Sequence, residues 1–153
     1  MGTGITTNAN YKKQSRLDDR LMTSMADKKV LVVEDDPFSQ KFFQKVISDN
    51  YKNVGIVFAR DYESALRAYY LHGGFDMVIL DIFLEGRRSG VELYKTLREI
   101  TSSTSFIMTS ALEPENYREL FDEDLNPPPY LQKPFQPEEC AELVNVFMKG
   151  DAS

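Results

Sequence analysis

The chain has 153 residues, of which 42% are apolar and 27% are charged, and its formal net charge is −6. This length and composition are typical of one globular domain with a single core. The acidic balance argues against direct nucleic-acid binding, which calls for a basic surface. No apolar run approaches the roughly 18 residues of a membrane span. The single cysteine, Cys140, excludes an internal disulfide and a cysteine-based zinc site.

The first segment of the chain differs from the rest in charge and pattern. Residues 1–28 are polar and lack apolar periodicity, which predicts a disordered or tag-like tail, with a short helix over residues 17–25 as an alternative. Residues 1–29 carry a net charge of +3, which leaves −9 for the remainder. The start has no apolar core of a secretory signal, so a cytoplasmic location is the default expectation. We expect one domain over residues 29–149 and a C-terminal end at 150–153.

Apolar runs of strand length alternate with amphipathic stretches of helical length along this domain. The expected strands cover residues 30–33, 54–58, 76–80, 105–109 and 129–132. The expected helices begin after Asp36, after Asp61, near Val91, at Pro114 and at Pro137.

Two of these helices carry specific expectations. In the first, Phe38 belongs to an apolar series at helical spacing that also includes Phe42 and Phe43. The fourth is expected to end near Asp122 and to turn three side chains inward, namely Tyr117, Leu120 and Phe121.

Five strands alternating with five helices predict an α/β fold, a doubly wound parallel sheet covered on both faces in a flavodoxin-like, three-layer architecture. In such a sheet, ligands bind at the carboxyl ends of the strands, near a topological switch point. Candidate functional residues should therefore follow the strands directly.

Reactive side chains do occur at these strand ends. Glu34, Asp35 and Asp36 follow the first strand, Asp81 follows the third, and the fourth and fifth are followed by Ser110 and by Lys133. Carboxylates without histidine or cysteine suit a hard divalent cation, Mg²⁺ first, with Mn²⁺ as an alternative. The cation would offset the repulsion among the acids.

These residue types fit phosphoryl transfer. Asp81 can serve as the nucleophile, and Ser110 and Lys133 can donate to phosphoryl oxygens. Asp35, together with Glu34, is expected to hold the cation beside Asp81. The remaining acid, Asp36, is expected to cap the following helix.

Four stretches carry a resemblance to a known family: VLVVEDDP, DMVILD, IMTSA and YLQKPF. Their order and spacing over about residues 28–149 resemble the CheY-like receiver domain of two-component response regulators. The resemblance implies that Asp81 is the phosphoacceptor. It also implies that Asp35 binds Mg²⁺ directly, that Glu34 binds it through water, and that the backbone carbonyl of Phe83 completes the metal shell.

The resemblance further implies a switch. Ser110 would turn toward the phosphoryl group, Lys133 would pair with that group, and Tyr130 would move in when Ser110 does. The peptide before Pro134 would be cis. The face made by the fourth helix, fifth strand and fifth helix would then be read by a partner and could support a dimer.

The resemblance also implies the partners of this switch. The phosphoryl donor would be a histidine kinase or a phosphotransfer protein. The receiver of the signal would be a downstream protein, or an effector domain cut from a longer chain. The chain would not be an enzyme in the turnover sense.

The chain departs from the family pattern in two loops. Glu85 stands where the family often has proline, and the loop to Gly90 is one residue longer and carries Arg87 and Arg88. Three consecutive prolines, residues 127–129, precede the fifth strand.

Two side chains in family positions that tune attack by water on the phosphoryl group are Phe83 and Leu112. Neither can orient a water by hydrogen bonding, so we expect slow loss of the phosphoryl group.

Three other functions fit the pattern less well. A phosphatase of the haloacid-dehalogenase type would need a second acid where Phe83 stands, and it would usually need a cap domain. A pseudo-receiver would bind partners without phosphorylation, against which the acids, Ser110 and Lys133 all speak. Flavin mononucleotide binding would need a phosphate loop after the first strand, where three acids occur instead.

Overall fold

The computed structural model describes residues 26–121 and 126–148. The predicted N-terminal tail up to residue 25, including the alternative helix at 17–25, lies outside the described residues, as does the end at 150–153. The first strand begins at Lys28, a residue that the sequence pattern places in the tail.

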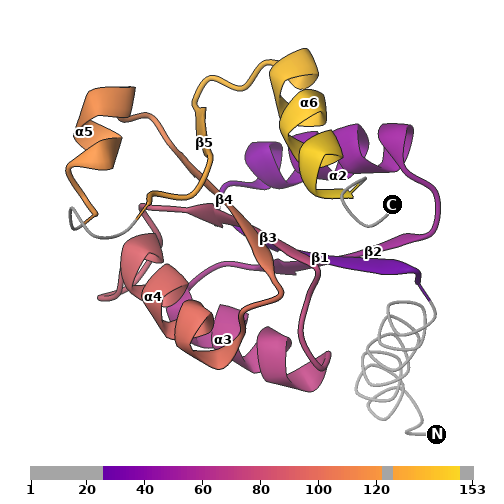
Figure 1. Cartoon of the computed structure of the whole chain (residues 1–153), viewed down its shortest axis with the longest axis horizontal. Helices are drawn as coiled ribbons and strands as arrows, with labels where there is room; N and C mark the ends of the chain where they lie inside the picture. The colour runs from indigo at the N-terminus through magenta and orange to yellow at the C-terminus, as the bar shows by residue number, and fades with distance from the viewer. Residues whose placement is uncertain (1–25, 122–125, 149–153) are drawn as a thin grey trace, which may run out of the picture.

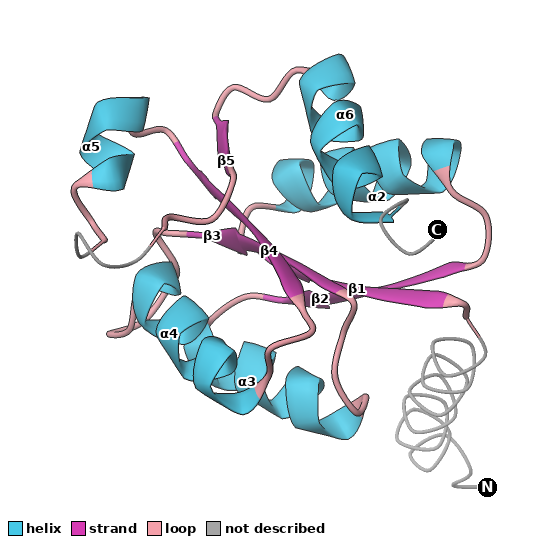
Figure 2. Cartoon of the chain, viewed as in Figure 1, coloured by secondary structure: helices cyan, strands magenta, loops and turns pink. Residues whose placement is uncertain are grey.

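The described chain forms one five-stranded parallel sheet flanked by helices, which confirms the predicted architecture (Figure 2). The strands are β1 (Lys28–Val33), β2 (Val54–Ala59), β3 (Met77–Asp81), β4 (Ser105–Ser110) and β5 (Tyr130–Gln132). The helices are α2 (Pro37–Asn50), α3 (Tyr62–Leu71), α4 (Gly90–Ile100), α5 (Pro114–Arg118) and α6 (Pro137–Met148). The strand order is β2-β1-β3-β4-β5.

Helices cover both faces of the sheet, so the central strands are buried on both sides (Figure 1). Successive residues of a strand point to opposite faces. Val30 and Val32 therefore pack with α2 and α6, and Leu31 and Val33 pack with α3 and α4. This double burial explains why β1 and β3 are continuous apolar runs without alternation.

The strand order places the two acidic strand ends next to each other. Along the chain, β2 is added on one side of β1, whereas β3, β4 and β5 follow on the other side. The order of the strands thus reverses between β1 and β3, which is the switch point of a doubly wound fold. Val33 is in register with Leu80, so Glu34 follows β1 beside Asp81, the last residue of β3. This edge is where the sequence predicts a ligand.

Two apolar side chains expected inside lie at the surface. Phe38 is 82% exposed, because it lies five residues before the buried Phe43 and thus about 140° around the helix from it. Leu120 is 40% exposed, because α5 ends at Arg118 and Leu120 lies in the turn after it. The helix is thus shorter than the sequence predicted.

Among the described residues, no helix has both the length and the apolar character needed to cross a membrane.

Candidate functional site

Three acids meet at the carboxyl edge of the sheet. Glu34, Asp35 and Asp81 each place a carboxylate oxygen within 4.8 Å of the others. Glu34 and Asp81 are buried, with exposed fractions of 1% and 4%, and Asp35 is half-buried. Three carboxylates are an all-oxygen donor set, which suits a hard cation such as Mg²⁺.

Lys133 connects two of these acids. Its Nζ lies 3.0 Å from Asp81 Oδ2 and 3.1 Å from Glu34 Oε2. The backbone N–H of Lys133 donates to the carbonyl of Ser110 at 2.7 Å, which ties the end of β5 to the end of β4. The following peptide, Lys133–Pro134, is cis.

Burial and ion pairing both shift pKa values in this cluster. It raises the pKa of Glu34 to about 7, with the charge of Asp81 adding to the rise while the Asp36 N–H and Lys133 oppose it. Burial by itself would lower the pKa of Lys133, but the ion pairs with Asp81 and Glu34 outweigh it and leave that pKa raised.

The donor set therefore fits a cation. Two buried carboxylates share one ammonium group, so negative charge is left over in a poorly hydrated place. Within the described chain, Glu34 Oε2 has no hydrogen-bond partner besides its ion pair with Lys133. This oxygen can accept a further bond, which a hydrated Mg²⁺ would provide.

Asp36 is separate from the cluster, as predicted from its place before α2. Its carboxylate accepts hydrogen bonds from the hydroxyl of Ser39 at 2.9 Å and from the N–H of Ser39 at 3.2 Å. The Ser39 hydroxyl lowers the pKa of Asp36. The third acid of the EDD run is thus the N-cap of α2.

The backbone around Asp81 is held from two sides. Asp81 Oδ1 accepts a hydrogen bond from the N–H of Phe83 at 3.0 Å. The N–H of Gly90 donates to the carbonyl of Ile82 at 2.8 Å. The side chain of Phe83 is 60% exposed beside the site, whereas Leu112 is half-buried.

Ser110 and Tyr130 form a direct pair. Their hydroxyl oxygens lie 2.5 Å apart, and the Tyr130 hydroxyl donates to the carbonyl of Leu112 at 2.7 Å. The family resemblance implies that Tyr130 moves in when Ser110 does. In the structure Tyr130 already lies against Ser110.

Sequence reasoning missed two residues at this edge. Gln40 donates from Nε2 to the carbonyl of Glu34 at 2.6 Å, which fixes the start of the acidic run. Tyr117 was expected only as a core residue, yet its ring stacks on Tyr130. Gln40 is only six residues from Glu34, but a glutamine in a first helical turn is no signal by itself, and the stack of Tyr117 on Tyr130 depends on how α5 packs against β5.

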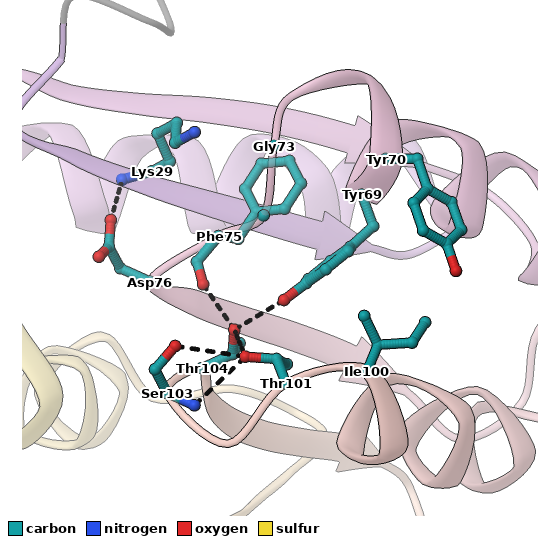
Figure 3. A pocket seen from close by; sticks show the side chains of 11 residues that line it. Lys29, Tyr69, Tyr70, Gly73, Phe75, Asp76, Ile100, Thr101, Ser103 and Thr104 are labelled. Atoms are coloured by element: carbon teal, nitrogen blue, oxygen red, sulfur yellow. Dashed lines mark hydrogen bonds between the residues drawn. The ribbon is translucent and has the colours of Figure 1, made fainter.

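A hollow of about 430 Å³ lies at the opposite edge of the sheet, between the ends of α3 and α4 (Figure 3). None of the predicted site residues lines it. Two of its hydroxyls bond within the hollow: Thr104 Oγ1 donates to the carbonyl of Phe75 at 2.7 Å and lies 3.1 Å from the hydroxyl of Tyr69. The hollow is therefore separate from the acidic cluster.

Comparison with known proteins agrees with this geometry. Residues 30–145 match the sequence model of the response regulator receiver domain. A search of curated proteins found no match.

Solved structures give the same result. The receiver domain of the Francisella response regulator 1452 is 29% identical, with a TM-score of 0.65 over 80% of this chain and 98% of that one. A candidate response regulator from Chloroflexus aurantiacus is 26% identical, with a TM-score of 0.67 over 79% of this chain and 97% of that one. The response regulator PhyR from Brucella abortus shares the fold, with 20% identity and a TM-score of 0.68 over 94% of this chain and 58% of that one.

Proposed function

Because the chain belongs to the response regulator receiver family, we propose that it is a phosphorylation-dependent switch whose phosphoacceptor is Asp81. The observation that carries the proposal is the position of the Lys133 ammonium group between Asp81 and Glu34, with Asp35 in the same cluster. Receiver domains are signalling modules, and this site has the groups that such a module needs to accept a phosphoryl group.

The proposed reaction transfers a phosphoryl group from a phosphohistidine of a histidine kinase or phosphotransfer protein. A carboxylate oxygen of Asp81 forms a bond to phosphorus while the bond from phosphorus to the histidine nitrogen breaks. The electron pair of that bond leaves with the imidazole, which takes up a proton. The product is an acyl phosphate on Asp81.

The residues around Asp81 have separate tasks in this step. The N–H of Phe83 holds one carboxylate oxygen, and Lys133 pairs with the other. Lys133 is also placed to neutralise a phosphoryl oxygen, and Ser110 would donate to a second one. A Mg²⁺ ion held by Asp35, Asp81, the carbonyl of Phe83 and, through water, Glu34 would supply the remaining positive charge.

The output is proposed to pass through α5, β5 and α6. These elements carry or adjoin Ser110, Tyr130 and Lys133, so a change in the hydrogen bonds of these residues biases that face. A downstream protein or an attached effector domain would read it, and two copies of the chain could pair through it.

The test is the intact mass after incubation with Mg²⁺ and acetyl phosphate. We expect the protein to gain one phosphoryl group, Asp81→Asn to gain none, and a chelator to abolish the gain. Asp76→Asn is the matched control, because Asp76 lies at the opposite edge and its contact with the N–H of Lys29 can be kept by asparagine.

Two results would contradict the proposal. A gain of mass in Asp81→Asn would place the acceptor elsewhere. Failure of the parent protein to gain mass, together with failure to bind beryllofluoride in the presence of Mg²⁺, would make the chain a protein-binding pseudo-receiver.

A further inference from the structure

Tyr117, on α5, lies flat against Tyr130. The ring centroids are 4.0 Å apart and the planes differ by only 9°. Tyr117 is 3% exposed, so its ring has no room to turn away. Phe121 packs edge-on against Tyr117 at 5.2 Å. The buried ring of Tyr117 therefore packs against one face of the Tyr130 ring and limits its movement on that side.

The three-proline segment anchors the other end of Tyr117. The Tyr117 hydroxyl donates to the carbonyl of Pro128 at 2.5 Å. The next residue, Pro129, accepts a hydrogen bond from the N–H of Met108 in β4 at 2.9 Å. Because each proline ring fixes φ, this segment is stiff. The ring of Tyr117 is thus held by Phe121, and its hydroxyl is held by the segment that directly precedes β5.

The hydroxyl protons at this site can be assigned by counting donors. Tyr130 has one hydroxyl proton, and the carbonyl of Leu112, 2.7 Å away, is its closest carbonyl acceptor. The oxygen of Tyr130 is then free to accept the proton of Ser110, 2.5 Å away. Ser110 Oγ also accepts from the N–H of Leu112 at 3.1 Å. In the arrangement that satisfies all three contacts, the only proton of the Ser110 hydroxyl is engaged by Tyr130.

We propose that Tyr117 is a positioning residue that holds Tyr130 inside before Asp81 is modified, and that Tyr130 competes with the phosphoryl group for the hydroxyl of Ser110. The competition rests on the proposed function, whereas the positioning of Tyr130 does not. On phosphorylation, the Ser110 hydroxyl then stops donating to Tyr130 and donates to the phosphoryl group. The ring of Tyr130 does not move inward in this step, because it is already inside. The three-proline segment holds the hydroxyl of Tyr117 and thereby sets how firmly Tyr117 holds Tyr130 in place.

The positioning is tested without any phosphoryl group, by solvent paramagnetic relaxation of the tyrosine ring protons in the full chain. The Tyr130 signal is assigned by its loss in Tyr130→Phe. We expect Tyr130, which is half-buried, to be clearly more protected than the exposed Tyr70, and beryllofluoride with Mg²⁺ to leave this protection unchanged. Tyr117→Leu should raise the relaxation of Tyr130 several-fold.

Two variants separate positioning from general loosening of the core. Tyr117→Phe keeps the stacked ring and loses only the hydrogen bond to Pro128. It should therefore retain most of the protection of Tyr130 that Tyr117→Leu removes. Tyr62→Leu makes the same change at another buried tyrosine, which bonds to Thr96, and should leave Tyr130 protected. Two results would overturn the positioning of Tyr130 by Tyr117. One is that the ring protons of Tyr130 relax as fast as those of Tyr70 until beryllofluoride is added. The other is that Tyr117→Leu leaves the relaxation of Tyr130 unchanged.

The competition is tested by the affinity for beryllofluoride in the presence of Mg²⁺. Tyr130→Phe frees the Ser110 proton, so binding should tighten roughly two- to tenfold, the range expected for one hydrogen bond. In a Ser110→Ala background this gain should vanish. Unchanged or weaker binding by Tyr130→Phe would overturn the competition. If no variant binds beryllofluoride, the proposed function and the competition both fail, while the relaxation experiment still judges the positioning.

Discussion

At the residue scale, Gly90 controls the backbone of the proposed phosphoacceptor. It is the first residue of α4, and a Cβ built on it would lie 2.0 Å from the carbonyl oxygen of Asp81 and 2.9 Å from Cα of Ile82. Both neighbours are backbone atoms, which cannot move aside without moving β3. The hydrogen of glycine is what lets α4 start so close to the site.

Replacing Gly90 by alanine should destabilise the fold. We expect Gly90→Ala to lower the free energy of unfolding by about 3 kcal/mol or more, because overpacking against backbone leaves no rotamer to relax. Urea unfolding measures this loss. Gly73→Asn is the control, because Gly73 has positive φ and an open surrounding that asparagine tolerates. Equal stability of the two variants would contradict this packing.

Phe83 should govern how long the phosphoryl group persists on Asp81. Its side chain is large, apolar and 60% exposed beside the site, so it can exclude water but cannot orient it by hydrogen bonding. We expect slow loss of the phosphoryl group from the protein and a several-fold faster loss from Phe83→Asn. The decay of the phosphorylated mass after removal of acetyl phosphate measures both rates. A half-life of seconds in the parent protein would contradict the prediction.

At the element scale, α2 and α3 begin where short sequence patterns predict them. Asp36 caps α2, and Asp61 forms a capping box with Ser64 at the start of α3. These bonds span three residues, so the sequence is enough to find them. The length of α5 was predicted wrongly, because the path of the chain after Arg118 is decided by packing with distant segments.

The buried face of α6 makes a prediction about its one thiol. Cys140 is 1% exposed, and burial raises its pKa to about 12. Its thiolate fraction at pH 8 should be roughly a thousandfold below that of an ordinary thiol. Ellman's reagent should therefore label native Cys140 only as fast as the protein unfolds, because the folded chain both covers the thiol and keeps it protonated.

The same helix offers the control. Val146 is 67% exposed, so Val146→Cys should add one thiol that reacts quickly and gains rate with pH as it ionises near its usual pKa. Rapid labelling of Cys140 in the native protein would contradict the burial of this face.

At the scale of the whole molecule, Mg²⁺ binding should couple to stability. The cluster of Glu34, Asp35 and Asp81 exists only in the folded chain, so a cation bound there stabilises it by about 2.7 kcal/mol at a hundred times its dissociation constant. Thermal unfolding with increasing Mg²⁺ should show a saturating rise of the melting temperature.

Two neighbouring acids separate the metal site from a general charge effect. Asp35→Asn should abolish most of the rise, because it removes a carboxylate of the cluster. Asp36→Asn removes the same charge one residue later but keeps a side chain that can cap α2, so the response to Mg²⁺ should remain. An equal loss in both variants would rule out the specific site.

The sequence by itself determined the fold class and the acidic edge. Apolar runs, helix caps and the residues directly after each strand are local patterns, and parallel strands bring their carboxyl ends together by topology alone. Glu34, Asp81 and Lys133 could therefore be assembled into one site from these patterns. Ser110 was also found from its place after the fourth strand, whereas its switch role and Tyr130 were identified through the family resemblance.

Only the tertiary structure decided how these groups contact one another. Three contacts join residues from separate elements: Gly90 fits against Asp81, Tyr117 stacks on Tyr130, and the Ser110 hydroxyl bonds to that of Tyr130. Such contacts depend on helix placement to within an ångström, because steric overlap and hydrogen bonding change steeply over that distance. Residue patterns carry no information at that precision, so these contacts are visible only in the folded chain.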